Sequence, residues 1–358
     1  MNIDFDGKSF LKDQKYVLLF GGSGYEREVS IAGAYEFLKA AENSGLDFLP
    51  IYINSSGDFY VFIGKADDVL KIERNKSRKM LIPTSPVKLS GKGGFLLDGA
   101  VISPKFVFPL LHGDYGEDGV IQGLLAALGI DFFGADNFTG AIASDKVFSK
   151  IIARSVGVPT LPEITVTDEM NYEDILREID NTFGFPVFVK PARLGSSIGA
   201  SLAKSKQQFS KSLKKAFSVA KRIMIEPALL DKRELECAYY NVGERKIITP
   251  PAEVSISGGF YDFKLKYKSS DGVRLIPKAD VDESVKSKIV DCTDKLAKAL
   301  AVRHIARFDY FLSTDGNVYF NEVNTMPGMT SSSLYSVMLG GEGLNFTDFI
   351  LSVKEEFD

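Results

Sequence analysis

The chain has very few of the residues that build disulfide frameworks and soft metal sites. Its 358 residues include two cysteines, two histidines and no tryptophan. Cys237 and Cys292 cannot form a disulfide-rich scaffold or a zinc cluster, and so few cysteines are typical of a reducing compartment, so we expect a cytoplasmic protein. With so little histidine, any bound metal must be held by oxygen atoms, which favours Mg²⁺ over Zn²⁺.

Long apolar runs and a surplus of positive charge are also missing. No run approaches the roughly 20 apolar residues that a membrane-spanning helix needs, and the polar N-terminal stretch MNIDFDGKSFLKDQK is unlike a signal peptide. A net charge of −4 gives no electrostatic basis for binding nucleic acid. We therefore expect neither a membrane nor a nucleic-acid partner. The length and the ordinary balance of apolar and charged residues predict two or three globular domains.

Three regions of different pattern follow one another along the chain. Residues 1–135 alternate between strand-like and helical segments, which predicts an α/β domain with a parallel sheet. Residues 136–224 predict a small α+β unit, and residues 225–358 predict a second one. The expected helices are 30–45, 119–130, 139–157, 207–222, 284–300 and one at the C-terminus; the expected strands are 16–22, 47–54, 101–113, 131–134, 186–190, 222–229, 234–242 and 317–324.

The segment ARFDYFLSTDGNVYFNEVN (306–324) predicts a β-hairpin, because Asp315-Gly316 is a strong signal for a two-residue turn. Such a turn places Asp309 directly opposite Glu322. Side chains alternate between the two faces of a strand, so this register gathers several polar groups on one face. The residues that it places together are Arg307, Asp309, Phe311, Phe320, Glu322 and Asn324.

This polar face is a candidate metal site. Asp309 and Glu322 would repel each other unless positive charge lay between them. Two carboxylates and the amide oxygen of Asn324 form a ligand set for a hard cation, and Mg²⁺ commonly keeps positions open for substrate phosphates. The alternative is an exposed face whose charges are solvated by water. The apolar flanks and the presence of Arg307 on the same face favour the metal.

Two glycine-rich segments are candidate anion sites. ARLGSSIGAS (192–201) follows a strand ending at Lys190, and its small residues allow backbone N–H groups to approach phosphate oxygens. It lacks the GxxxxGK[ST] pattern, and a plain turn is the alternative; Lys190 and Lys146 favour phosphate. GGSGYEREVS (21–30) has a strand–glycine–helix form without the GxGxxG spacing, so a helix N-terminus that binds an anion and a simple tight turn both stay open.

The order of these segments resembles that of one known family. GGSGYEREVS, HGDYGEDGVIQG, DKVFSK, VKPARLGSSIG, FYDFKLKY and RFDYFL…FNEVNTMPGMTSSSLY, spread over roughly residues 16–352, make the chain similar to the D-alanine–D-alanine ligases of the ATP-grasp superfamily. The resemblance implies three domains: an N-terminal substrate-binding (pre-ATP-grasp) domain at 1–135, a small ATP-grasp domain at 136–224, and a C-terminal ATP-grasp domain at 225–358 with the metal site and a mobile loop.

The resemblance also implies a reaction and its ligands. Two D-alanines would be joined through a D-alanyl phosphate, at the expense of ATP and with two Mg²⁺ ions (or Mn²⁺), to supply peptidoglycan precursors. The enzyme would be a cytoplasmic homodimer. Implied ATP contacts are Lys146, Lys190, Glu226, Glu234 and Lys266; implied catalytic residues are Glu26, Ser196, Tyr267, Arg307 and Gly328, the last two at the oxyanion; implied metal ligands are Asp309, Glu322 and Asn324; and implied amino-acid contacts are His112, Ser333 and Leu334.

Two departures and several alternatives accompany this interpretation. The spacing from Glu226 to Glu234 is one residue longer than the family pattern, which puts the ribose contact of Glu234 in doubt, and Tyr25 is bulkier than expected beside the first-substrate pocket.

D-Serine is an alternative second substrate; Tyr267 argues against D-lactate. A non-catalytic ATP-binding protein is disfavoured by the intact metal and lysine residues, and a dehydrogenase by the absent dinucleotide fingerprint.

Overall fold

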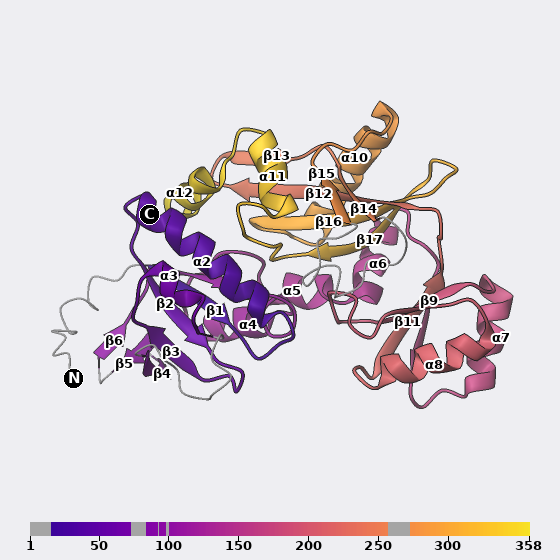
Figure 1. Ribbon diagram of the computed structural model, residues 1–358, viewed down its shortest axis with the longest axis horizontal. Coiled ribbons are helices and arrows are strands. Elements are labelled where there is room, and N and C mark those ends of the chain that lie inside the picture. Colours follow the sequence, from indigo (N-terminus) through magenta and orange to yellow (C-terminus); the bar gives the residue numbers. More distant parts are fainter. Residues whose placement is uncertain (1–15, 73–83, 92, 98–99, 257–272) are drawn as a thin grey trace.

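The protein forms three lobes joined in chain order (Figure 1). The computed structural model describes residues 16–72, 84–91, 93–97, 100–256 and 273–358. The N-terminal lobe lies at the left of the figure, a large sheet crosses the top, and a smaller sheet with two helices lies at the lower right. Among the described residues, no helix has the length and apolar character needed to span a bilayer.

The N-terminal lobe is built on a seven-stranded sheet. Its elements are β1 (Tyr16–Gly21), β2 (Phe48–Ile53), β3 (Phe59–Phe62), β4 (Thr84–Ser90), β5 (Gly94–Leu97), β6 (Ala100–Ile102) and β7 (Phe106–Leu110), with helices α2 (Arg27–Asn43), α3 (Ala66–Val69) and α4 (Val120–Ala127). The strand order is β6-β5-β4-β3-β2-β1-β7. β1 runs parallel to β2 and to β7 and is buried along its whole length, as the apolar run YVLLFG requires.

The predicted parallel sheet is confirmed only for the three strands β2, β1 and β7. The strands β3 to β6 extend it in antiparallel fashion, and the sequence did not indicate this extension. The apolar stretch 101–113 was expected as one strand, but it forms the end of β6 and then β7, with Ser103 and Pro104 in neither; proline has no N–H to donate to a ladder. The short strand expected at 131–134 is reduced to one parallel bridge between Phe132 and Val107.

The central lobe is a four-stranded antiparallel sheet in the order β10-β9-β11-β8. Its elements, with the two helices that lead into it, are α5 (Asn137–Ala143), α6 (Lys146–Ser155), β8 (Ile164–Thr167), α7 (Tyr172–Thr182), β9 (Val187–Pro191), β10 (Ser201–Ala203), α8 (Lys206–Phe217) and β11 (Arg222–Pro227). Residues of α7 and α8 share one buried apolar cluster with the sheet.

The single helix expected at 139–157 is instead two helices, α5 and α6. The Asp145 side chain accepts hydrogen bonds from the N–H groups of Val147 and Phe148, 3.1 and 3.2 Å away, and so caps the start of α6. Lys146 therefore occupies the first position of α6, and Lys150 lies one turn further on the same side of the helix.

The C-terminal lobe contains the large sheet, in the order β15-β14-β12-β16-β17 with β13 beside β12. Its elements are β12 (Arg233–Val242), β13 (Arg245–Ile248), β14 (Ala252–Ile256), β15 (Val273–Ile276), α10 (Glu283–Ala299), β16 (Ile305–Leu312), β17 (Val318–Asn324), α11 (Leu334–Gly341) and α12 (Phe346–Phe357). α10 packs on one face of this sheet. α11 and α12 belong to a cluster shared with the N-terminal lobe, where α12 lies beside α2 (Figure 1).

The turn of the β16–β17 hairpin differs from the predicted two-residue turn. Ser313 and Asn317 close it, with the Ser313 N–H 2.9 Å from the Asn317 carbonyl oxygen. Three residues, 314–316, therefore form the loop, and Gly316 adopts a φ of 80°, the left-handed conformation that a three-residue hairpin loop requires at this position. A two-residue turn at Asp315-Gly316 was wrong.

A β-bulge then restores the predicted pairing. Tyr310 pairs with Phe320 and Asp309 pairs with Glu322, so Asn321 is an extra residue in β17. Asp309 opposite Glu322 is thus confirmed. Phe320 was expected on the polar face, but the bulge turns it into the buried cluster under α10.

Candidate active site

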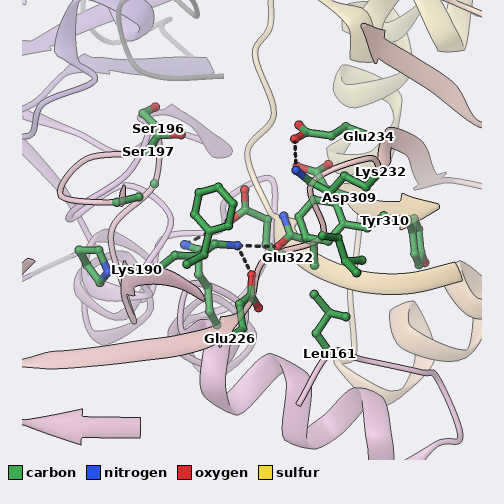
Figure 2. Close-up of a pocket in the computed structure, with 18 of the residues that line it drawn as sticks. Leu161, Lys190, Ser196, Ser197, Glu226, Lys232, Glu234, Asp309, Tyr310 and Glu322 are labelled. Carbon is green, nitrogen blue, oxygen red and sulfur yellow. Dashed lines mark hydrogen bonds and ion pairs between the residues drawn. The ribbon is translucent and has the colours of Figure 1, made fainter. Parts of the chain in front are cut away.

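A pocket opens between the central sheet and the C-terminal sheet (Figure 2). In the figure, Ser196 and Ser197 lie on one side, and Lys232, Glu234 and Asp309 lie opposite them. We call this the first pocket. The predicted residues that line it are Lys146, Lys190, Ser196, Glu226, Glu234, Asp309 and Glu322.

Glu226 is bound by two lysines at the floor of the first pocket. Lys150 and Lys190 each donate to a different oxygen of the Glu226 carboxylate. Burial raises the pKa of Glu226, but the two ammonium groups outweigh burial and hold that pKa at about 2. The Lys150 side chain has no exposed surface, and this burial lowers the pKa of Lys150. The negative charge of Glu226 acts in the opposite direction and only partly offsets the effect of burial. The pocket floor is therefore a preorganised ionic cluster, and Lys150 is a member that sequence reasoning missed.

The glycine-rich loop is held in an uncommon backbone conformation. Ser196 and Ser197 have φ values of 50° and 58°, in the left-handed region that costs residues other than glycine roughly 1 kcal/mol or more. Lys146 anchors the loop: its N–H donates to the Ala192 carbonyl at 2.8 Å, and its ammonium to the Leu194 carbonyl at 2.9 Å. The same ammonium lies 3.1 Å from Glu322, so Lys146 links this loop to β17.

A second pocket adjoins the first and reaches all three lobes. The predicted residues that line it are Glu26, His112, Ser196, Arg307, Glu322, Asn324, Gly328, Ser333 and Leu334, and Tyr25 lies at its wall with 61% of its surface exposed. Ser196 and Glu322 line both pockets. The structure therefore brings together the residues predicted for the amino-acid substrates, and it places them beside those predicted for the nucleotide.

Glu26 joins the N-terminal lobe to the glycine-rich loop. It precedes α2, and its carboxylate accepts a hydrogen bond from the Ser196 hydroxyl. The Glu26 carboxylate also lies close to the Gly113 backbone, since a Cβ on Gly113 would lie 2.3 Å from this carboxylate. Gly113 has a φ of 64°, in the left-handed region that favours glycine.

His112 is buried beneath the second pocket. Its Nδ1 lies 2.9 Å from the Met326 carbonyl oxygen, which can only accept, so Nδ1 carries the proton. Burial lowers the pKa of His112, with the charge of Glu26 opposing it. The neutral ring has no hydrogen-bond partner at Nε2 within the described part of the chain. Nε2 is therefore a buried acceptor without a partner among the described residues.

Glu117 follows His112 in the same loop and was not singled out from the sequence. One carboxylate oxygen accepts the Gly113 N–H at 2.9 Å, and the other accepts the Met326 N–H at 3.0 Å. Burial, with the charge of Glu26, raises the pKa of Glu117 to about 7.

Arg307 and Asp309 form a paired unit on the polar face. Nε and Nη2 of Arg307 donate to the two oxygens of Asp309 at 2.7 and 2.8 Å. Nε also lies 3.1 Å from Glu236 on the neighbouring strand β12. Burial lowers the pKa of Arg307, but the carboxylates of Asp309 and Glu236 outweigh burial and raise it well above its ordinary value. The charge of Arg307 is therefore permanent.

The polar face carries a donor set that fits a hard cation. Asp309 and Glu322 are cross-strand neighbours, and the Asn324 amide lies 3.1 Å from Asp309. All three groups border one of the two pockets, so a cation held here would touch ligands in them. Across the described residues, no three acidic, histidine or cysteine side chains converge as metal ligands. The predicted set does not require such a group, since it has two carboxylates and one amide.

Lys232 enters the first pocket from the segment that is one residue longer than the family pattern. Its ammonium lies 3.1 Å from Glu234 and 4.8 Å from the centre of the Phe311 ring. Lys190 lies 5.4 Å from the same ring. Glu234 therefore lines the pocket despite the longer spacing, and its carboxylate is paired with the Lys232 ammonium group. Asn321, the bulge residue, accepts from Lys190 at 3.3 Å. Lys266 and Tyr267 lie outside the described residues.

Comparison with known proteins decides the family. A sequence model of the D-ala D-ala ligase N-terminus matches residues 15–135, and one of the D-ala D-ala ligase C-terminus matches residues 152–354. The chain belongs to the D-alanine–D-alanine ligase family. It is 34% identical over 351 residues to a D-alanine–D-alanine ligase from Streptococcus uberis, a match that covers 97% of each protein.

Solved structures of this family have the same architecture. A VanG D-Ala:D-Ser ligase from Enterococcus faecalis is 30% identical with a TM-score of 0.85, over 96% of this chain and 99% of that one. A D-alanyl-alanine synthetase A from Vibrio cholerae is 26% identical with a TM-score of 0.83, over 97% and 99% of the two chains. The three-domain ATP-grasp fold expected from the resemblance is therefore confirmed.

Proposed function

We propose that this protein is an ATP-dependent ligase that joins two D-alanine molecules into D-alanyl-D-alanine for peptidoglycan precursors. One observation carries the proposal: two pockets meet at Glu322 and Ser196, one lined by lysines and the other by groups suited to amino acids. A nucleotide in the first pocket would place its terminal phosphate at this junction, next to a substrate carboxylate in the second.

In the first step, the terminal phosphoryl group of ATP moves to a carboxylate oxygen of the first D-alanine, and ADP leaves. Lys146 and Lys190 bring positive charge to the phosphates, and the glycine-rich loop offers backbone N–H groups. Asp309, Glu322 and Asn324 would hold two Mg²⁺ ions, or Mn²⁺ in their place, and would thereby supply positive charge for the phosphate oxygens. By resemblance alone, Lys266 would approach the transferred phosphate, and Tyr267 would join Glu26 and Ser196 near the first substrate.

In the second step, the amine of the second D-alanine attacks the acyl carbon, a proton leaves the amine, and phosphate departs as the peptide bond forms. Negative charge builds up on the acyl oxygen. Arg307 and the Gly328 N–H border the second pocket and supply the donors for this oxyanion. Ser333 directly precedes α11, and Ser333 and Leu334 line the pocket where the second amino acid is expected.

D-Serine is the second candidate for the attacking amino acid. The similarity to the Enterococcus faecalis D-Ala:D-Ser ligase favours keeping it in the test. D-Lactate is the third candidate for the second substrate. The two amino acids differ by one hydroxyl group, so ligand competition decides between them.

The test is a product assay on the full chain with ATP, Mg²⁺ and D-alanine, alone or mixed with D-serine or D-lactate. We expect ADP and phosphate in equal amounts and D-alanyl-D-alanine as the main product by mass spectrometry, with L-alanine inactive. A dominant mixed product would move the assignment to that second substrate. ATP binding without D-alanine-dependent ADP release would support a non-catalytic nucleotide-binding protein instead.

A further inference from the structure

The loop between β7 and α4 aims the Glu117 carboxylate across the boundary between the N-terminal and C-terminal lobes. The loop folds back on itself, with the Glu117 N–H donating to the Gly113 carbonyl at 2.9 Å. A Cβ on Gly116 would lie 2.5 Å from the Leu111 backbone, so the chain is tightly wound here. This winding fixes the direction in which the Glu117 side chain leaves the loop.

The N-terminal lobe holds both hydrogen-bonding groups of the Met326 backbone. The Glu117 carboxylate accepts the Met326 N–H at 3.0 Å, and His112 donates to the Met326 carbonyl at 2.9 Å. The two partners are 209 and 214 residues distant from Met326 in the sequence. The second oxygen of Glu117 is bound to the Gly113 N–H at 2.9 Å, so the carboxylate cannot rotate freely. The Met326 side chain is also buried in the apolar cluster that the N-terminal and C-terminal lobes share.

This anchoring determines where the next residues lie. Pro327 follows Met326 and has a fixed φ, and Gly328 comes directly after it. Gly328 is the residue whose N–H we assign to the oxyanion, and its carbonyl accepts from the Ser333 hydroxyl at 2.5 Å. The segment 326–328 is therefore fixed at one end by Glu117 and His112 and at the other by the start of α11.

We infer that Glu117 is a positioning residue, which fixes the Met326 backbone to the N-terminal lobe and so places the Gly328 N–H for the ligation step. This inference rests on the proposed function. Glu117 borders the second pocket, but both of its carboxylate oxygens accept backbone N–H groups, those of Gly113 and Met326, so it acts through the Met326 N–H. Above the Glu117 pKa of about 7 the carboxylate is ionised, and a single charged hydrogen bond of this kind corresponds to about 10- to 100-fold in a rate that depends on it, so the measurements are made on the alkaline side of that pKa.

The experiment compares Glu117→Gln with the wild-type full chain. The glutamine has the same shape but presents an NH₂ group to one of the two N–H donors, so one contact is lost. We expect kcat for D-alanine-dependent phosphate release to fall about 10- to 100-fold, while ATP affinity by calorimetry stays within about 2-fold of the wild-type value. Amide hydrogen exchange in the peptide that contains Met326 should become faster, without substrates present.

A matched control and a second variant make the outcome decisive. Glu42→Gln changes another N-terminal-lobe carboxylate that accepts a backbone N–H, from Ala66 at 3.3 Å, and that lines neither pocket; it should leave kcat and exchange at Met326 unchanged. If Glu117→Gln does not fold, Glu117→Asp keeps the charge but is too short to bridge the two donors. Unchanged kcat, or a lower kcat with unchanged exchange at Met326, overturns the inference. A wild-type enzyme without D-alanine-dependent phosphate release refutes the proposed function, while the exchange measurement still tests the Met326 anchor.

Discussion

Asp309 lies directly opposite Glu322 across the β16–β17 ladder, and each carboxylate is bound to a different cationic side chain. Asp309 is bound by Arg307, and Glu322 by Lys146. Two facing carboxylates would destabilise the hairpin without this compensation. Arg307 and Lys146 therefore offset the repulsion between two carboxylates whose oxygens are ligands of the kind that Mg²⁺ prefers.

The Glu322 carboxylate is expected to be essential for activity and dispensable for folding. Glu322→Gln keeps the side-chain volume but removes one charged ligand, so we expect ligase activity to fall at least about 100-fold. The melting temperature should change little, because Lys146 keeps its contact with the Leu194 carbonyl. Asp315→Asn, at the tip of the same hairpin, is the control. Wild-type activity of Glu322→Gln at millimolar Mg²⁺ would contradict a metal role.

The two lysines on Glu226 should have separable effects. Lys190 lines the first pocket, so Lys190→Ala should weaken ATP binding about 10- to 100-fold while D-alanine binding changes less. Lys150 is sealed from solvent, so Lys150→Met should mainly destabilise the fold, by about 3 to 5 kcal/mol. Calorimetry with ATP and urea denaturation measure the two quantities. Equal ATP affinity in wild type and Lys190→Ala would refute the nucleotide assignment of Lys190.

Removing Arg307 should affect both catalysis and stability. Arg307→Met removes the proposed oxyanion donor and also the two hydrogen bonds from the Arg307 guanidinium to Asp309. We expect kcat to fall at least about 100-fold and the melting temperature to fall as well. Adding Mg²⁺ should restore part of the stability, because it compensates Asp309, without restoring kcat. Recovery of kcat together with stability would make Arg307 a structural partner only.

His304 should make the fold sensitive to mild acid. It stacks on Phe133 at 4.6 Å between ring centres, and burial, with the charge of Arg303, lowers its pKa from 6.5 to about 4. As the pH falls, His304 therefore takes up a proton in the unfolded chain before it does so in the folded protein. The contribution of neutral His304 to the free energy of unfolding is complete above pH 6.5 and is lost as the pH falls towards 4. The loss amounts to about 3 kcal/mol.

The measurement is urea denaturation at several pH values. His304→Gln should flatten the pH dependence of the unfolding free energy between pH 6.5 and 4. His112 also has a lowered pKa and titrates in the same direction, so part of the slope should persist in the variant. An unchanged slope would show that His304 is not the titrating group.

The sequence predicted those parts of the site that local patterns encode. Alternation along two strands was enough to pair Asp309 with Glu322, although the predicted turn was wrong and the bulge compensated for it. The glycine-rich loop after Lys190 was also predicted from a local pattern, the run of small residues that directly follows a strand. Lys150 was within reach of sequence reasoning, because it lies one helical turn from Lys146 on a helix that was expected.

Other parts depend on contacts between distant segments. Glu117 meets Met326 across 209 residues, and His304 meets Gly134 across 170, and no short-range pattern encodes such partners. The antiparallel strands β3 to β6 were missed because their runs are short and only weakly alternating. The sequence showed that the segment containing Lys232 is one residue longer than the family pattern. It did not show that the Lys232 ammonium group lies between the rings of Phe188 and Phe311, because that position depends on packing.

The three-residue loop and the bulge at Asn321 shift the register in opposite senses, so the pairing of Asp309 with Glu322 is kept while residues 314–317 stay exposed at the hairpin tip. The tip is therefore a suitable attachment point for a reporter group. Cys237 and Cys292 are both buried, and burial raises the pKa of the Cys237 thiol to about 12, which suppresses its reactivity. A thiol-reactive dye on an Asp315→Cys variant would label the exposed tip selectively and follow movements of the C-terminal lobe during turnover.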